Sequence, residues 1–127
     1  MRYPALLLSC LLLGGCSLNS ENSCKVTAVT FARQVDGPKT VRVNQEAKFA
    51  VLLQADNSCG KFDSFVEASV GDTVQIASKI SYDGCVCAQT KPTIQADYTF
   101  RATRAGTYYL QFLTDTSRFI VDTLVVQ

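Results

Sequence analysis

The sequence predicts an all-β protein, an antiparallel β-sandwich of seven to eight short strands that forms one domain over residues 24–127. Beyond residue 24, apolar residues recur at every second position, which is typical of half-buried strands. Turn-forming residues interrupt these runs at short intervals, and no stretch has the pattern of a helix of ordinary length. The 127 residues suffice for one hydrophobic core and are too few for two ordinary domains.

The chain begins with the pattern of a secretory leader, predicted over residues 1–15. Arg2 provides a positive start, and an apolar run follows over residues 5–13. Nine residues of helix would be about 14 Å long, roughly half of the hydrocarbon core of a bilayer. We therefore expect a cleaved signal peptide and not a transmembrane anchor.

The end of this leader, Leu13-Gly14-Gly15-Cys16, resembles the lipobox of bacterial lipoproteins. The resemblance covers residues 1–17 and implies that the Cys16 thiol receives a diacylglycerol, that cleavage falls before Cys16, and that its new amino group is acylated. Two or three acyl chains anchor a protein firmly, because each buried methylene contributes about 0.8 kcal/mol. Ser17 stands where an aspartate would favour inner-membrane retention in enterobacteria, so the resemblance implies an outer-membrane lipoprotein of the bacterial envelope, on its periplasmic face or at the cell surface. The alternative is ordinary secretory cleavage nearby.

Residues 16–23 comprise the expected lipidated cysteine and a short polar tether, SLNSENS. At about 3.5 Å per residue the tether reaches roughly 25 Å when extended. The lipid bilayer is thus the first predicted partner, and the domain is expected to lie close to it.

The strands of the domain follow in order. We expect them over residues 25–32 with a second piece near 40–43, then 47–55, 61–69, 73–82, 93–102, 107–114 and 118–126. The clearest alternation is in residues 93–102, where Ile94, Ala96, Tyr98 and Phe100 share one face.

The stretch RAGTYYLQF, residues 104–112, resembles the entry into strand F of immunoglobulin-like domains. In that family a tyrosine at the position of Tyr108 bonds with its hydroxyl to upstream backbone, and a core cysteine stands at the position of Leu110. Because the chain has neither that cysteine nor any tryptophan, the resemblance is to the bacterial immunoglobulin-like and fibronectin-like sandwiches, not to antibody domains. The alternative is that Tyr108, Leu110 and Phe112 simply form the core face of one strand.

Four cysteines remain once Cys10 leaves with the leader and Cys16 carries lipid: Cys24, Cys59, Cys85 and Cys87. The predicted topology places all four at one end of the sandwich. We expect two structural disulfides in which Cys24 and Cys59 each pair with one member of the Cys85-Val86-Cys87 motif. A metal site and a redox-active pair are the alternatives.

The charge balance and the missing histidine exclude several functions. The chain has 12 Lys and Arg, 11 Asp and Glu, and no His. These charges are scattered, so a nucleic-acid partner is not expected. The acids are isolated, mostly at turns or at positions expected to face outward, and no phosphate or calcium loop occurs, so we expect neither catalysis nor a cofactor. The acids in question are Asp36, Asp56, Asp63, Glu67, Asp72, Asp83, Asp97, Asp115 and Asp122.

Two polar segments are candidate binding loops, residues 34–39 (QVDGPK) and 88–92 (AQTKP), although both also suit plain connectors. The sequence thus predicts a non-enzymatic lipoprotein that binds an envelope protein or glycan, or assists assembly. The alternatives are an immunoglobulin-like protease inhibitor and a metal or thiol-redox carrier.

Overall fold

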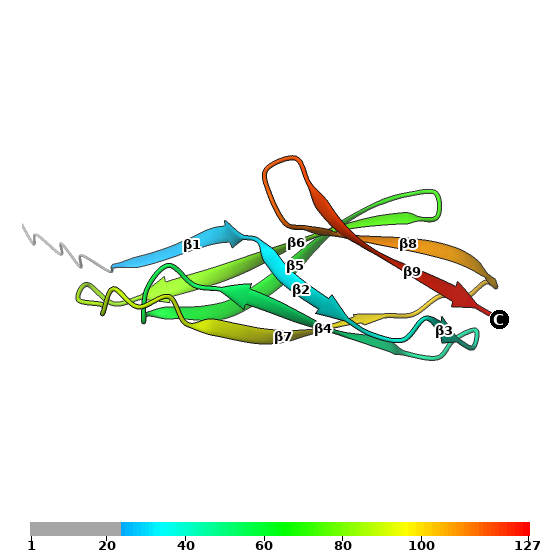
Figure 1. Ribbon diagram of the computed structural model, residues 1–127, viewed down its shortest axis with the longest axis horizontal. Helices are drawn as coiled ribbons and strands as arrows, with labels where there is room; N and C mark the ends of the chain where they lie inside the picture. Colours follow the sequence, from blue (N-terminus) through cyan, green and yellow to red (C-terminus); the bar gives the residue numbers. More distant parts are fainter. Residues whose placement is uncertain (1–23) are drawn as a thin grey trace, which may run out of the picture.

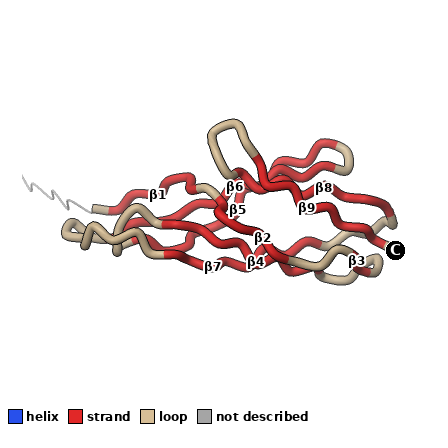
Figure 2. The backbone as a smooth tube through the Cα atoms, in the orientation of Figure 1, coloured by secondary structure: helices blue, strands red, loops and turns tan. Residues whose placement is uncertain are grey.

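The computed structural model describes residues 24–127, and all regular structure there is β-strand. The strands are β1 (Lys25–Thr30), β2 (Ala32–Asp36), β3 (Thr40–Val41), β4 (Ala47–Gln54), β5 (Gly60–Val70), β6 (Thr73–Asp83), β7 (Thr93–Phe100), β8 (Gly106–Leu113) and β9 (Phe119–Val126). They form a six-stranded sheet and a three-stranded sheet, β2-β4-β7. The predicted all-β sandwich is confirmed (Figures 1 and 2).

The core lies between the two sheets, as the alternation predicts. Its largest fully buried side chains belong to four strands, and they are Phe49, Val51, Leu53, Ile76, Ile80, Leu110, Phe112 and Leu124. On β7, Ala96 and Tyr98 are buried, whereas the residues between them and beside them are exposed or half-buried. Burial of alternate apolar side chains is the main source of stability in such a fold.

The first predicted strand is divided between the two sheets, which raises the count to nine strands. β1 pairs with β6 in the six-stranded sheet, and after Phe31 the chain crosses over so that β2 pairs with β4. The short β3 then returns to the first sheet and pairs with β9 in parallel. A bend that moves a strand from one sheet to the other is a known way to close the corner of a sandwich.

The strand order differs from the immunoglobulin arrangement at one place. There the fourth strand joins the sheet of the first, second and fifth. Here the corresponding strand, β6, lies in the other sheet, where it pairs antiparallel with β5 along its length and parallel with β8 over Thr73–Ile76. The tight β5–β6 hairpin keeps these two strands together, so β6 takes the place beside β8.

Candidate functional site

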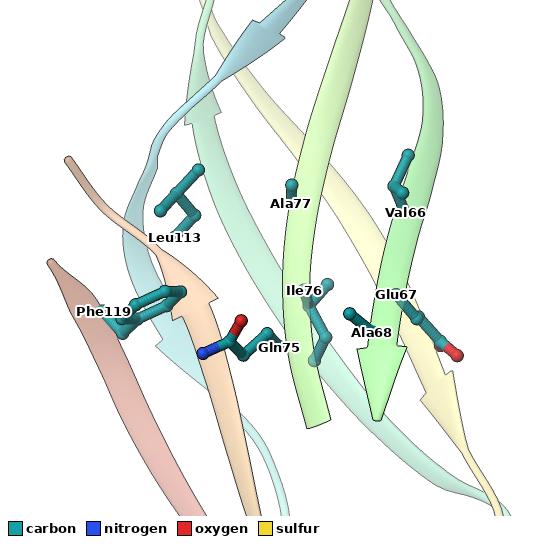
Figure 3. A pocket seen from close by; sticks show the side chains of 8 residues that line it. All are labelled: Val66, Glu67, Ala68, Gln75, Ile76, Ala77, Leu113 and Phe119. Carbon is teal, nitrogen blue, oxygen red and sulfur yellow. The ribbon is translucent and has the colours of Figure 1, made fainter. Parts of the chain in front are cut away.

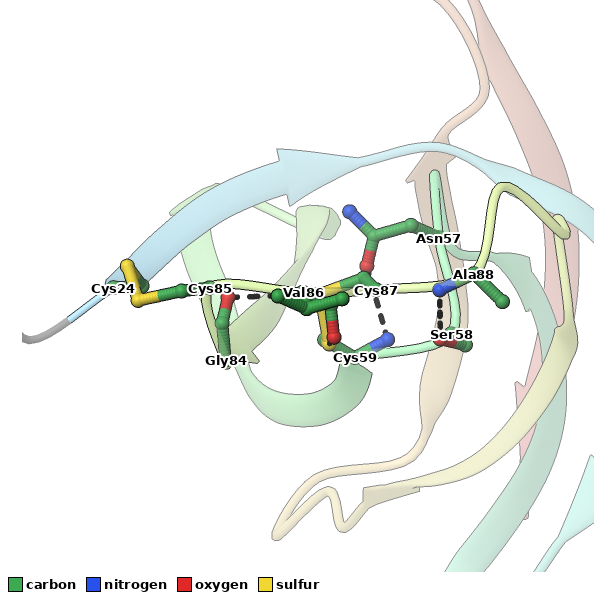
Figure 4. Close-up of a disulfide and its surroundings, with 9 residues drawn as sticks. All are labelled: Cys24, Asn57, Ser58, Cys59, Gly84, Cys85, Val86, Cys87 and Ala88. Atoms are coloured by element: carbon green, nitrogen blue, oxygen red, sulfur yellow. Dashed lines mark hydrogen bonds between the residues drawn. A yellow bond between two sulfur atoms is a disulfide. The ribbon is translucent and has the colours of Figure 1, made fainter.

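Four cysteines meet at the end of the sandwich where β1 begins, which we call the cysteine pole (Figure 4). Cys24 is bonded to Cys85 with their Cα atoms 5.0 Å apart, and Cys59 to Cys87 with Cα atoms 5.6 Å apart. Each cysteine of the CVC motif is thus bonded to one distant cysteine, as the sequence predicted. Val86 between them is 94% exposed.

Strand register explains why these cysteines meet. Lys25 of β1 is opposite Asp83 of β6, and Gly60 of β5 is opposite Tyr82. The residues before β1, before β5 and after β6 therefore arrive at the same end of the sheet. The Gly84 amide donates a hydrogen bond to the Cys24 carbonyl at 2.9 Å, which continues the β1–β6 pairing up to the disulfide.

Gly84 is required by the packing of the two disulfides. Its φ is +145°, a region that side chains rarely adopt, and a Cβ there would lie 2.9 Å from the Cys59 sulfur. Nearby, the Asn57 side-chain oxygen accepts a hydrogen bond from the Cys59 amide at 2.9 Å. This short Asx-type turn fixes the direction of the backbone at Cys59.

Residues 88–92, one of the candidate binding loops, are held at both ends. The Ala88 amide donates to the Ser58 hydroxyl at 2.8 Å, and the Ser58 amide donates to the Ala88 carbonyl at 3.0 Å. At the other end, the Ala55 amide donates to the Pro92 carbonyl at 2.9 Å. Residues 89–91, which lie between these contacts, are exposed and take part in none of them. The segment as a whole therefore has the contacts of a connector.

Residues 34–39, the other candidate loop, are not one loop. Gln34, Val35 and Asp36 belong to β2 and pair with β4. The remaining connection has structural contacts of its own, because a Cβ on Gly37 would lie 2.2 Å from the Phe49 ring. The prediction of a loop is wrong for the first half of this segment, since the pairing of β2 with β4 continues further than the turn residues indicate.

Asp122 differs from the sequence expectation, because it does not face outward. It is 3% exposed, and its Oδ1 accepts a hydrogen bond from the Lys39 Nζ at 2.6 Å. A signal for this burial was present in the sequence, since Asp122 has the same phase in β9 as the buried Leu124 and Val126. The ion pair joins the β2–β3 connection to β9.

Tyr108 makes the contact that the immunoglobulin-like resemblance implies. Its hydroxyl donates to the Arg104 carbonyl at 2.9 Å, and its ring packs against Phe100 with centroids 5.3 Å apart. Leu110, at the position of the family's second cysteine, is fully buried. The hydroxyl and ring together fix the corner that leads from β7 into β8.

A second tyrosine links the two sheets along their open edge. The Tyr98 hydroxyl on β7 donates to the Glu67 carboxylate on β5 at 2.5 Å. Burial raises the pKa of Tyr98 far above its ordinary value of 10.0, and the hydrogen bond to Glu67 and the charge of that carboxylate act in the same direction. This tyrosine is therefore a neutral donor at physiological pH, with a structural role.

Among residues 24–127, no group of three or more His, Cys, Asp or Glu residues is placed to hold a metal ion. In the same range, no helix is long and apolar enough to cross a membrane. Three acids link segments that are distant in the sequence: Glu46 binds Arg101, Glu67 binds Tyr98, and Asp122 binds Lys39.

Cys16, the leader and the tether lie outside the described residues, so acylation stays a prediction of the sequence. Comparisons of the chain with family models, with curated proteins and with solved structures found no match. The site described here, a doubly cross-linked pole directly after a predicted lipid tether, therefore rests on this chain's own residues.

Proposed function

We propose that this protein is a bacterial envelope lipoprotein, anchored to the outer membrane through acylated Cys16, and that its sandwich domain acts as a non-catalytic binding or assembly module. The sequence LGGC supports the anchor, and two disulfides support an oxidising compartment, where such bonds persist. Its partner is an envelope protein or glycan.

The observation that carries the proposal is the disulfide at the point where the tether enters the domain. The sequence places seven residues between Cys16 and Cys24, and Cys24 is bonded to Cys85. Tension on a lipid anchor would load the start of β1, which could otherwise separate from β6 one backbone hydrogen bond at a time. A covalent bond before the first of these pairs transfers the load to β6, the strand that pairs with β1, β5 and β8.

The described contacts favour a binding role over a catalytic one. The acids with described ion pairs or tyrosine contacts hold strands together, as shown above. All four cysteines of residues 24–127 are in disulfides, whereas a metal carrier would need their thiolates.

Mass spectrometry of the native polypeptide tests the anchor. We expect the chain to begin at Cys16 and to carry two or three acyl groups, and cells grown with an alkyne-labelled fatty acid should label it. Cys16→Ser should abolish the label, whereas Cys10→Ser, a matched change in the leader, should leave it intact. A native chain with residue 16 unmodified, or still joined to Gly15, would contradict the proposal.

A further inference from the structure

The six-stranded sheet has an unusual outer surface, opposite the core. Alternation along β5, β6, β8 and β9 directs one set of side chains outward, and the register aligns them in three rows across the four strands. We call these three rows the outer face, and they comprise Val66, Ala68, Val70, Thr73, Gln75, Ala77, Tyr109, Gln111, Leu113, Phe119, Val121 and Thr123. None of these residues is charged, although the chain has 23 charged side chains.

The most exposed large side chains of the outer face are mainly apolar. Val70 is 78% exposed, Val121 53%, Val66 45% and Tyr109 44%. The polar members are uncharged, and two of them satisfy each other, since the Gln75 amide donates to the Gln111 side-chain oxygen at 3.3 Å. The largest apolar patch on a protein surface is often a functional one.

The smaller sheet provides the comparison within the same molecule. Its outward residues include Asp36 on β2, Lys48 on β4 and Asp97 on β7. Charges of this kind keep a sheet face solvated. On the six-stranded sheet the outward charges Lys25, Lys79 and Asp83 lie on β1 and on the second half of β6, towards the cysteine pole, and the outer face carries none. Solvation alone does not explain this uncharged region.

A groove crosses one end of the outer face (Figure 3). Leu113 and Phe119 form one wall, and Val66 and Ala68 lie across from them. The groove has a volume of about 210 Å³ and is lined mainly by apolar side chains. Glu67 also lines the groove, and its carboxylate accepts the hydrogen bond from Tyr98. The next row is filled by Val121 and the glutamine pair, so a partner would find a shallow hollow whose lining is uncharged apart from this one carboxylate.

We infer that the outer face binds the outer face of a second copy of this chain, forming a two-fold symmetric dimer. In such a dimer the same patch is buried on both copies, and a residue meets its own copy only on the two-fold axis. The patch must therefore pair its charges across the axis or carry none. A surface without charges meets this condition. A charged partner, by contrast, would find no complementary charge there.

The area suits a weak dimer. Four strands about 4.8 Å apart and three rows about 7 Å apart span roughly 20 Å by 20 Å. Two such faces would cover about 800 Å² in total, below the range of stable interfaces and among the weak, transient ones. Confinement of both copies to one membrane would raise their effective concentration and favour the pairing.

The position of the outer face permits both copies to be anchored, a point that rests on the proposed function. The face lies along the flank of the domain, while β1 begins at one end and the C-terminus lies at the other (Figure 1). A two-fold axis parallel to the long dimension would place both cysteine poles on the same side. Both tethers could then enter one membrane.

Native mass spectrometry of the full mature protein, released from detergent micelles, tests the inference. We expect a dimer for the wild type and for Val86→Asp, a matched change at a 94% exposed valine outside the outer face. Val121→Asp should raise the dimer dissociation constant by at least about tenfold, because two carboxylates would be desolvated in the interface. Val70→Lys provides a second charge at a 78% exposed position, where folding does not depend on the side chain.

The same spectra report the acyl groups on residue 16 independently of the dimer, so a failure of the inference and a failure of the proposed function are distinguishable. A wild-type monomer would overturn the inference, as would a dimer that survives both Val121→Asp and Val70→Lys. A monomer that instead carries a different protein or a lipid, and loses it in Val121→Asp, would identify another occupant and overturn it too.

Discussion

The two ends of the sandwich are closed by different means. At the cysteine pole, no residue between Asp83 and Thr93 is buried, and two disulfides cross-link the connections. At the opposite end, which we call the distal pole, Val41 of the short strand β3 and Ala102 of the β7–β8 connection are buried, and no cysteine lies there among the described residues. Both disulfides end in the β6–β7 connection, which has no buried residue, whereas the β4–β5 connection that carries Cys59 contributes the buried Ala55 to the core. The comparison indicates that the disulfides hold the connection that contributes no side chain to the core.

Three of the non-covalent contacts at the distal pole join separate parts of the chain through side chains. The Lys39–Asp122 ion pair joins the β2–β3 connection to β9, the Phe49 ring packs under Gly37, and the Tyr108 hydroxyl binds the Arg104 carbonyl. Each is worth about 1 to 3 kcal/mol at most, whereas one disulfide can contribute about 4 kcal/mol. We therefore expect the stability of the cysteine pole to depend mainly on its two disulfides, and that of the distal pole to be shared among several weaker contacts.

Removal of one disulfide should have the largest effect. The Cys24–Cys85 bond closes a loop with a sequence separation of 61 and the Cys59–Cys87 bond one of 28. Loop-closure entropy predicts losses of about 4.3 and 3.6 kcal/mol in the free energy of unfolding for the respective paired Cys→Ala variants. Chemical denaturation of each variant measures both values. Losses below about 1 kcal/mol for both pairs would show that the cysteine pole is held by its hydrogen bonds, which would remove the contrast between the poles.

Much of the fold could be predicted because its signals are local. Apolar alternation identified the strands, and turn residues separated them, so the end at which each connection lies followed from counting strands. That count brought the four cysteines together and favoured the observed pairing of Cys24 and Cys59 with the CVC motif. Tyr108 was identified through a family motif, and its contact with Arg104 agrees with the expected role.

What could not be predicted depends on contacts between distant segments. Alternation shows which residues share a face but not which strand lies beside it, so the crossing at Phe31 and the parallel pairing of β6 with β8 had no local signal. The burial of Asp122 depends on Lys39, 83 residues away, reaching its carboxylate. The outer face likewise became visible only once the register aligned four strands.

Replacement of Lys39 should have an intermediate effect at the distal pole. Lys39→Met leaves the Asp122 carboxylate, which is 3% exposed, without its charged partner. Because the lysine side chain itself is 72% exposed, we expect a loss of about 1 to 2 kcal/mol, less than for a fully buried pair. Thermal and chemical unfolding at low and high salt would measure it. Lys48→Met, at an exposed lysine on β4, should cost less than about 0.5 kcal/mol, and equal losses for the two variants would contradict a role for the ion pair.

The smallest expected effect is that of Tyr108→Phe, which removes one hydroxyl and keeps the ring against Phe100. Loss of the hydrogen bond to the Arg104 carbonyl should lower the free energy of unfolding by about 1 kcal/mol. Tyr109→Phe is the matched control, since the next residue faces outward and should change stability by less than about 0.5 kcal/mol. Equal effects would mean that Tyr108 acts only through its ring as part of the core face with Leu110 and Phe112. The corner would then be closed by packing alone, and the distal pole would contrast with the cysteine pole even more strongly.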